Sequence, residues 1–265
     1  MRIAVMKETA PGETRVAASP ETVKKFIALG AEVAVEPGAG LSASIADADY
    51  AAAGAIVAKN AVKGADIVLG VQGPDVAALK SAAKGAWIVA GLDPFGQRTR
   101  IDAYAKAGFE TLAMEFMPRI TRAQSMDILS SQSNLSGYKA VIEAANVYGR
   151  AFPMMMTAAG TVSAAKAFVM GVGVAGLQAI ATARRLGAQV SATDVRSATK
   201  EQIMSLGAKP IFVESVAGIE GEGAGGYATE MSPEYQAAQA ELVSAVVMTM
   251  SCLAICALTS SAGAA

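Results

Sequence analysis

The chain has 265 residues, of which 53% are hydrophobic, and its formal net charge at pH 7 is −1. This length allows one large domain or two ordinary ones, and the near-neutral charge without a basic cluster argues against nucleic-acid binding. The sequence contains no histidine, which excludes Ser-His and Cys-His catalysis and histidine-based metal sites. The two cysteines, Cys252 and Cys256, are predicted to be buried thiols rather than metal ligands.

The first ~120 residues alternate apolar strand patterns with helix patterns. The expected strands cover residues 2–5, 32–36, 67–71, 87–90 and 111–113, and the expected helices cover residues 20–29, 47–53, 76–83 and 100–107. Ser19 is predicted to cap the first helix, which would end before Gly30. Such alternation is typical of a parallel sheet with helices on both faces. This part is therefore predicted to be a doubly wound domain without a glycine fingerprint.

A long helix pattern at residues 124–151 is predicted to link the first domain to a second one. Beyond it, an apolar strand pattern at 167–170 runs into Gly171-Val-Gly-Val-Ala-Gly176. A helix pattern at 177–186 follows, and then a strand pattern at 189–193 that ends at Asp194. Strand, G-x-G-x-x-G turn, helix, strand and acid, in this order, form the dinucleotide-binding fingerprint.

Each part of this fingerprint has a physical role. Gly171 would allow the tight turn, Gly173 would let a pyrophosphate approach the backbone, and Gly176 would let the helix pack closely on the strand. The free N–H groups at the helix N-terminus would bind the phosphates. Asp194 would accept hydrogen bonds from a ribose diol and repel a 2′-phosphate, which favours NAD over NADP.

The C-terminal part is less regular. A helix is expected at 199–206, a strand at 210–213 and a mobile surface loop at 217–226. Residues 242–265 contain no charged side chain and show no clear period. Three alternatives remain for this segment: a buried strand with its loop, a short membrane tail, or a segment foreign to the original fold.

A polar stretch lies just before the second domain. Gln124, Asp127 and Ser131 are spaced by three to four residues, which would place them on one face of the linking helix. They could pair with the carboxamide and ribose hydroxyls of a nicotinamide nucleotide, whereas a capped and solvated first turn explains them equally well. Arg15 is a further candidate for such a contact, although a surface salt bridge is expected for it, and Met154–Met156 are expected in flexible packing.

These stretches together resemble domain I, the NAD(H)-binding domain, of the proton-translocating NAD(P) transhydrogenases, in their alpha subunit. A more distant similarity is to alanine dehydrogenase, which shares the architecture. The resemblance covers residues 1 to 244 and is carried by Lys7–Ala17, Met114–Tyr138, Pro153–Thr161, Gly171–Asp194 and Ala224–Met231. It implies an α/β fold of two Rossmann-like doubly wound domains, residues 1–125 and 126–265, joined by the long helix.

The resemblance also assigns site residues. It implies that Arg119, Gln124 and Asp127 take part in catalysis beside the nicotinamide, with Gln124 helping to bring two nicotinamide rings together. By the same resemblance, Ser130 would lie with them, Tyr138 would support the site, and Tyr227 would lie on a loop that closes over NAD. The other residues expected to bind NAD(H) are Gly171, Gly173, Val174, Ala175, Gly176, Asp194 and Val195.

The implied function is hydride transfer between NAD(H) and NADP(H), catalysed as part of a proton-translocating (Si/Re-specific) transhydrogenase. NADP(H) would be bound by a partner domain III, and a membrane domain II would couple the reaction to proton movement. The family's domain I is dimeric, so a homodimer is expected. Through these partners the chain would be cytoplasmic and peripheral to the cytoplasmic membrane. Because the nicotinamides carry the hydride, the absence of histidine is compatible with this chemistry.

The chain departs from the family pattern in two places. Residues 70–74 read Gly-Val-Gln-Gly-Pro and lack both basic residues usual there, one of which contacts substrate in alanine dehydrogenases. Residues 245–265 diverge, so the second domain is predicted to be incomplete, with one sheet face and edge uncovered. Reduced stability and weak or absent NAD binding are expected as a result. Two alternatives therefore remain: an alanine dehydrogenase-type oxidoreductase, and an inactive truncated nucleotide-binding fold.

Overall fold

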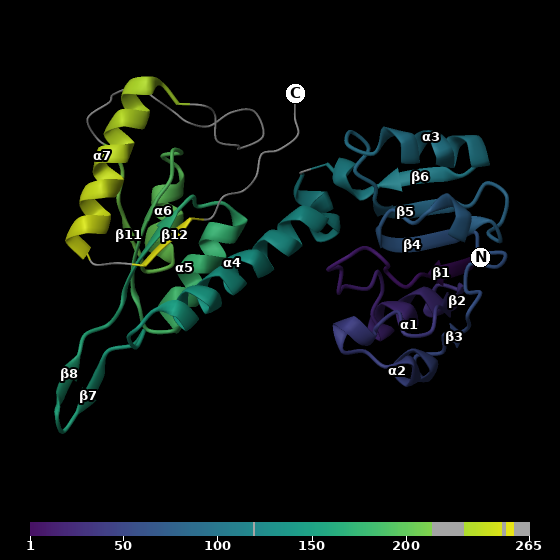
Figure 1. The fold of residues 1–265 in the computed structure, drawn as a ribbon, viewed down its shortest axis with the longest axis horizontal. Helices are drawn as coiled ribbons and strands as arrows, with labels where there is room; N and C mark the ends of the chain where they lie inside the picture. The colour runs from purple at the N-terminus through teal and green to yellow at the C-terminus, as the bar shows by residue number, and fades with distance from the viewer. Residues whose placement is uncertain (119, 214–230, 251–252, 257–265) are drawn as a thin grey trace. The chain divides into compact units, whose positions relative to one another are not determined.

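The structure, a computed structural model, describes residues 1–118, 120–213, 231–250 and 253–256. The chain forms two units, Met1–Asp127 (unit 1) and Ile128–Ala265 (unit 2), each with its own sheet and core (Figure 1). Both units are mixed α/β structures whose main sheet is parallel.

Unit 1 contains a six-stranded parallel sheet in the order β3-β2-β1-β4-β5-β6. Its strands are β1 (Arg2–Val5), β2 (Glu32–Val35), β3 (Ile56–Val57), β4 (Ile67–Gln72), β5 (Trp87–Gly91) and β6 (Glu110–Ala113). Because β1 pairs with β2 on one side and with β4 on the other, the strand order reverses between β1 and β4. The predicted doubly wound sheet is confirmed. Only β3 was not predicted, because two residues are too few to make a pattern.

The helices of unit 1 begin and end largely where the sequence predicts. They are α1 (Pro20–Ala28), α2 (Asp47–Ala52) and α3 (Arg98–Ala107), with short 3₁₀ helices η1 (Leu41–Ala43), η2 (Val76–Leu79), η3 (Met114–Phe116) and η4 (Thr121–Met126). Ser19 caps α1 and accepts a hydrogen bond from the Thr22 N–H at 3.2 Å. The helix predicted at 76–83 is wrong beyond Leu79, because the backbone there bonds to the 64–65 segment: Gly64 N donates to the Ser81 carbonyl.

The alternation of side chains along β1 explains why unit 1 has two cores. Ile3 and Val5 pack on one face of the sheet with Tyr50 of α2, whereas Ala4 packs on the other with Tyr104 of α3. Each tyrosine hydroxyl donates to a backbone carbonyl, that of Ala18 or that of Pro74. Both faces of the sheet are therefore covered, as the near-continuous apolar strands require.

Unit 2 contains a four-stranded parallel sheet in the order β11-β10-β9-β12. Its strands are β9 (Lys166–Met170), β10 (Gln189–Thr193), β11 (Lys209–Pro210) and β12 (Leu253–Cys256), and its helices are α4 (Ile128–Val147), α5 (Val174–Arg185), α6 (Thr199–Ser205) and α7 (Pro233–Met250). The strand predicted at 210–213 is thus shorter and lies earlier, because only Lys209 and Pro210 pair with β10.

Strand β12 covers the side of β9 that was expected to be an open edge, and becomes the terminal strand of the described sheet. It pairs in parallel with β9, from Leu253 opposite Ala167 to Cys256 opposite Met170. Of the three alternatives for the apolar C-terminal segment, a strand is therefore the right one for residues 253–256. Among the helices that the structure describes, none is both long enough and apolar enough to cross a bilayer. The loop predicted at 217–226 lies outside the described residues, as do Cys252 and the side chain of Cys256.

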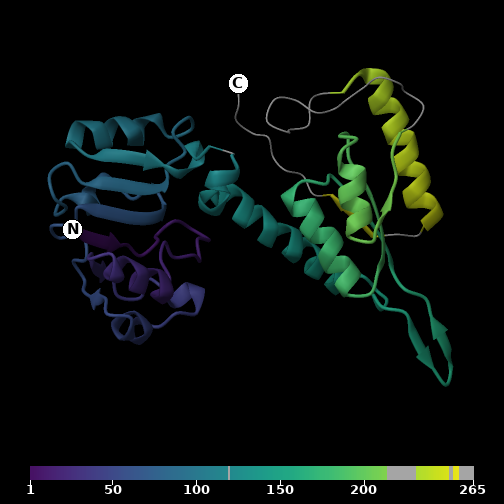
Figure 2. The same ribbon diagram turned by 180° about the vertical axis from the view of Figure 1, so that it is seen from behind.

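Two further expectations about unit 2 are wrong. The helix expected over 124–151 begins only at Ile128, because η4 ends at Met126 and Asp127 is extended (φ −76°, ψ 99°). Met154–Met156 do not pack in the core but lead into a two-stranded antiparallel hairpin of β7 (Met155–Thr157) and β8 (Gly160–Val162). Both views show this hairpin extending away from the four-stranded sheet (Figure 1, Figure 2), and Met156 is 79% exposed because the hairpin pairs only with itself.

Candidate functional site

The glycine turn lies where the strand order of unit 2 reverses. It follows β9, whose two neighbours are β10 on one side and β12 on the other. Crevices at such reversal points, beyond the carboxyl ends of parallel strands, are where ligands bind in open α/β sheets. The sequence pattern and the topology therefore indicate the same place.

The backbone of the turn explains its glycines. Gly171 has φ +89°, in the left-handed region that favours glycine, and its N–H donates to the Thr193 carbonyl at 2.9 Å. Helix α5 then begins at Val174, with Gly173 as its N-cap in an extended conformation. Since glycine has no side chain, it cannot cap the first-turn amides of α5, which are the donors that a bound anion would use.

Helix α4 lies directly on the first turn of α5. A Cβ atom added to Gly137 would lie 2.0 Å from the Ala175 carbonyl oxygen, so only glycine permits this approach. Nearby, the Asn134 amide nitrogen donates to the Gln178 side-chain oxygen at 3.3 Å. In the sequence, Gly137 is only a glycine inside a helix pattern. The sequence did not predict its contact with α5, because the periodicity of one helix does not show which other helix packs on it.

Asp194 is buried at the end of β10, with 6% of its surface exposed. Its Oδ2 accepts the Val172 N–H, within the glycine turn, at 2.6 Å. Arg196 provides three more donors: its backbone N–H and Nε to Oδ1, and Nη2 to Oδ2, each at 2.9 Å. The acid that ends the fingerprint is therefore tied both to the turn and to an arginine.

These contacts keep Asp194 charged. Burial alone would raise the pKa of its carboxyl, but the hydrogen bonds from the Arg196 side chain and backbone and from Val172 outweigh burial and hold the pKa below its usual value. A buried carboxylate beside an uncapped helix N-terminus suits one half of a dinucleotide: the amides match its phosphates and the carboxylate matches ribose hydroxyls. Val195, which follows Asp194, is half-buried.

The residues predicted on the nicotinamide side do not share one helix face. Gln124 lies exposed in η4, and its carbonyl accepts the Asp127 N–H at 3.3 Å. Asp127 is half-buried between η4 and α4, Ser130 is half-buried in the first turn of α4, and Tyr138 is exposed further along α4. Gln124 and Asp127 belong to unit 1, whereas Ser130 and Tyr138 belong to unit 2. Arg119 and Tyr227 lie outside the described residues.

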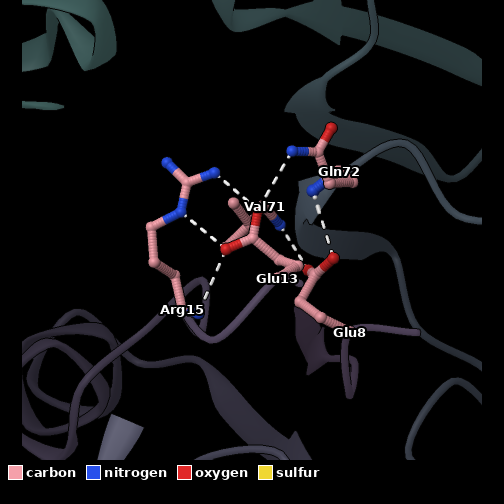
Figure 3. A network of polar contacts seen from close by, with 5 residues as sticks. All are labelled: Glu8, Glu13, Arg15, Val71 and Gln72. Atoms are coloured by element: carbon pink, nitrogen blue, oxygen red, sulfur yellow. Dashed lines mark hydrogen bonds and ion pairs between the residues drawn. The ribbon is translucent and has the colours of Figure 1, made fainter. Parts of the chain in front are cut away.

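Unit 1 carries a polar network at the corresponding point of its own sheet, where Glu8, Glu13 and Arg15, which follow β1, meet the last two residues of β4 (Figure 3). Glu8 accepts the N–H groups of Val71 and Gln72 at 2.6 and 3.2 Å. Glu13 accepts Arg15 Nε at 2.7 Å, Arg15 Nη2 at 2.5 Å and the Gln72 side-chain amide at 3.0 Å. Hydrogen bonding to Arg15 lowers the pKa of Glu13 to about 2. The salt bridge expected for Arg15 is confirmed, whereas the network around it was not predicted.

Comparisons with known proteins give a family match for each half of the chain. The chain matches the model of the alanine dehydrogenase/PNT N-terminal domain over residues 4–136 and that of the C-terminal domain over residues 140–264. It is 56% identical over 254 residues to an NAD(P) transhydrogenase alpha-subunit protein of Rhodospirillum rubrum, covering 92% of this chain and 65% of that protein. Against alanine dehydrogenase of Mycobacterium tuberculosis it is 30% identical over 207 residues, covering 74% of this chain and 54% of that protein.

Similar folds occur among solved structures. The crystal structure of transhydrogenase from Sinorhizobium meliloti superposes with a TM-score of 0.83 at 54% identity, covering 94% of this chain and 68% of that one. An L-alanine dehydrogenase superposes with a TM-score of 0.69 at 26% identity, covering 79% of this chain and 60% of that one. The chain thus spans 65% of the length of its Rhodospirillum relative, and the match to the C-terminal domain runs through residue 264.

Proposed function

Because the chain belongs to the alanine dehydrogenase/PNT family, we propose that it is the NAD(H)-binding component of a proton-translocating transhydrogenase. In this role it exchanges hydride between NAD(H) and NADP(H), the latter held by a separate NADP(H)-binding domain. The observation that carries the proposal is the glycine turn at the strand reversal of unit 2, tied to the buried and charged Asp194.

The adenosine half of the site is built by unit 2. The first-turn amides of α5, at Val174, Ala175 and Gly176, hold the pyrophosphate, which the extended Gly173 lets approach the backbone. Asp194 accepts the hydroxyls of the adenine ribose, and Val195 lies beside them. The negative charge on Asp194 opposes a 2′-phosphate, which makes the site selective for NAD(H) over NADP(H).

On the nicotinamide side, the bound cofactor supplies the hydride chemistry, and the protein positions it. Gln124, Asp127 and Ser130 offer a carboxamide, a carboxylate and a hydroxyl, which can pair with the nicotinamide carboxamide and its ribose. Gln124 is exposed, as a residue that meets a second nucleotide must be. Arg119, Tyr138 and Tyr227 are proposed to complete this side of the site.

The proposed partners follow from the reaction. NADP(H) is bound by domain III, and membrane domain II couples hydride transfer to proton movement, so the chain acts at the cytoplasmic surface of the membrane. We also propose a homodimer, which the exposed β7–β8 hairpin supports, since Met154 and Met156 are 62% and 79% exposed.

The first alternative, an amino-acid dehydrogenase of the alanine type, is less well supported. The segment at residues 70–74 lacks the basic residue that contacts substrate in alanine dehydrogenases, and its Gln72 side chain donates to Glu13. The guanidinium of Arg15 lies nearby, but it forms an ion pair with the same Glu13. The second alternative, an inactive truncated fold, is weakened by β12, which pairs with β9 beside the glycine turn.

NADH titration followed by nicotinamide fluorescence, with NADPH as the control ligand, tests the proposal. We expect the wild-type chain to bind NADH and not NADPH. Gly173→Val should weaken NADH binding by about a hundredfold or more, because its side chain blocks the pyrophosphate. Gly149→Val is the matched control, since a Cβ at Gly149 meets nothing within 4 Å. A folded wild-type chain that does not bind NADH would contradict the proposal.

A second experiment tests the reaction. Mixing the chain with a transhydrogenase domain III should give reduction of a bound NADP⁺ by NADH, and Gln124→Ala should slow this transfer while leaving the NADH dissociation constant within a few fold. Pyruvate- and ammonium-dependent oxidation of NADH, without domain III, would instead establish the alanine dehydrogenase alternative.

A further inference from the structure

The carboxylate of Asp194 is fully engaged. A carboxylate offers about four acceptor positions, and in this chain the Val172 N–H and three donors of Arg196 point to them. The two backbone N–H groups are fixed by the fold. Any ribose diol that pairs with Asp194 must therefore replace the two side-chain hydrogen bonds, from Nε and Nη2 of Arg196.

The backbone holds Arg196 at this place. Its carbonyl accepts the Thr199 N–H at 3.2 Å and the Thr199 hydroxyl at 2.7 Å, so the turn between β10 and α6 is anchored. Only the side chain is able to move away from Asp194, and 19% of it is exposed. An arginine beyond the end of the second strand of this fold is positioned to accommodate the 2′-phosphate of NADP(H).

We propose that Arg196 is a specificity-determining residue that forms a latent 2′-phosphate-binding site, which Asp194 occupies in place of the phosphate. This inference rests on the proposed NAD(H) site. Asp194 excludes NADP(H) twice over: its own charge repels the 2′-phosphate, and it engages the guanidinium that would otherwise bind the phosphate in a bidentate pair. Arg196 in turn competes with the ribose diol of NAD(H) for the carboxylate.

Two cations lie near this loop, Arg196 and Lys200, and their contributions to phosphate binding can be separated by experiment. Lys200, one turn further along, places its ammonium 5.0 Å from the centroid of the Phe212 ring, so it is a second cation near the same loop. Tyr235 of α7 is buried; burial and then the charge of Asp194 raise the pKa of its phenol, so it stays neutral. A gain of phosphate binding can therefore be assigned to Arg196 or to Lys200 by comparing two substitutions of equal charge.

Asp194→Asn is the central variant, because it removes the charge and keeps an acceptor for the Val172 N–H. Fluorescence titrations should show NADH binding weakened by about tenfold or more and NADPH binding strengthened by about tenfold or more. The gain for NADPH should disappear in Asp194→Asn/Arg196→Gln and persist in Asp194→Asn/Lys200→Gln. Equal loss of the gain in both double variants, or no gain in a folded single variant, would overturn the inference.

Arg196→Gln tests the same inference from the other side, and it serves if Asp194→Asn does not fold. It exposes both carboxylate oxygens, so NADH should bind about threefold or more tightly and NADPH should still be rejected. A folded Arg196→Gln protein that binds NADH about tenfold more weakly would show that the arginine assists NADH, which overturns the inference. Wild-type chain that binds neither nucleotide would contradict the proposed function and this inference together, whereas wild-type binding of NADH without the variant effects contradicts the inference alone.

Discussion

The two units place different chemistry at the same point of a similar sheet. In both, the first strand of the sheet has neighbours on either side, and the strand order reverses beside it. In unit 2 a glycine turn and the uncapped start of α5 follow that strand. In unit 1 the corresponding space holds Glu8 and Glu13, which accept backbone amides and the guanidinium of Arg15.

The difference shows that sheet topology creates the crevice and that a few local residues decide whether it is open to a ligand. Unit 1 satisfies its amides with carboxylates from its own chain, so an anion would meet negative charge there. In the described part of unit 2, no side chain caps the first turn of α5, so its amides are available to an anion. Substitutions in each unit can test this contrast, and their expected effects differ in size.

Gly137→Ala should have the largest effect on stability, and it acts on unit 2. Alanine favours a helix by about 1 kcal/mol over glycine, but its Cβ would lie 2.0 Å from the Ala175 carbonyl oxygen and must push α4 away from α5. We expect a net loss of about 2–3 kcal/mol in the free energy of unfolding and weaker NADH binding. Urea unfolding would measure the first and fluorescence titration the second. Gly149→Ala is the control, and an unchanged stability of Gly137→Ala would refute the helix contact.

Glu13→Gln should destabilise unit 1 by on the order of 1–2 kcal/mol at neutral pH, an amount limited by the solvent access of Arg15. The folded pKa of Glu13, about 2, lies below its usual 4.5, so its contribution is present above pH 4.5 and lost as the pH falls toward 2. The stability difference between the wild type and Glu13→Gln should therefore shrink over that window. Trp87, the only tryptophan, lies in unit 1 and reports its unfolding by fluorescence. A stability difference between the two proteins that is constant with pH would contradict the ion pair. NADH binding by Glu13→Gln should equal that of the wild type.

Ser19→Ala should have the smallest effect. It removes the acceptor of the Thr22 N–H at the start of α1 and should lower the stability of unit 1 by about 1 kcal/mol. Because α1 belongs to unit 1 and the proposed glycine-turn site belongs to unit 2, the NADH affinity should stay the same. Trp87 fluorescence during urea unfolding measures the change, and Ser42→Ala, at an exposed serine in η1, is the control. If Ser19→Ala weakened NADH binding, the two units would be coupled and the contrast between them would not hold.

Features with a local physical signal were predictable from the sequence. Ser19 caps a helix by bonding three residues ahead, and Gly171 is required by its own backbone angle, so each is visible in a short window. The fingerprint, the strands of unit 1 other than β3, and β9 and β10 of unit 2 were found for this reason. The close approach at Gly137 and the pairing of β12 with β9 depend on residues far apart in the chain, and no short window contains both partners.

The candidate site was predicted in outline only. Asp194 was expected to face a ribose, but its pairing with Arg196 was not, because an arginine two residues after an acid points to the same side only when the turn has the right shape. Gln124 and Asp127 are three residues apart, as on one helix face, but they do not lie in the same helix. The extended backbone at Asp127 interrupts the helix there, since aspartate readily occupies the non-helical position before a helix begins.

The pairing of β12 has a consequence for synthesis on the ribosome. The sheet of unit 1 is complete once residue 113 has been made, so that unit can fold while the rest is translated. In unit 2, β9 ends at Met170 but its neighbour β12 begins only at Leu253. At about 5–20 residues per second, the β12 side of β9 waits for roughly 4–17 s. An open strand edge during that interval is a site for pairing with other nascent chains. Slower elongation should therefore lower the soluble yield of the chain, through association at the open edge of β9 in unit 2.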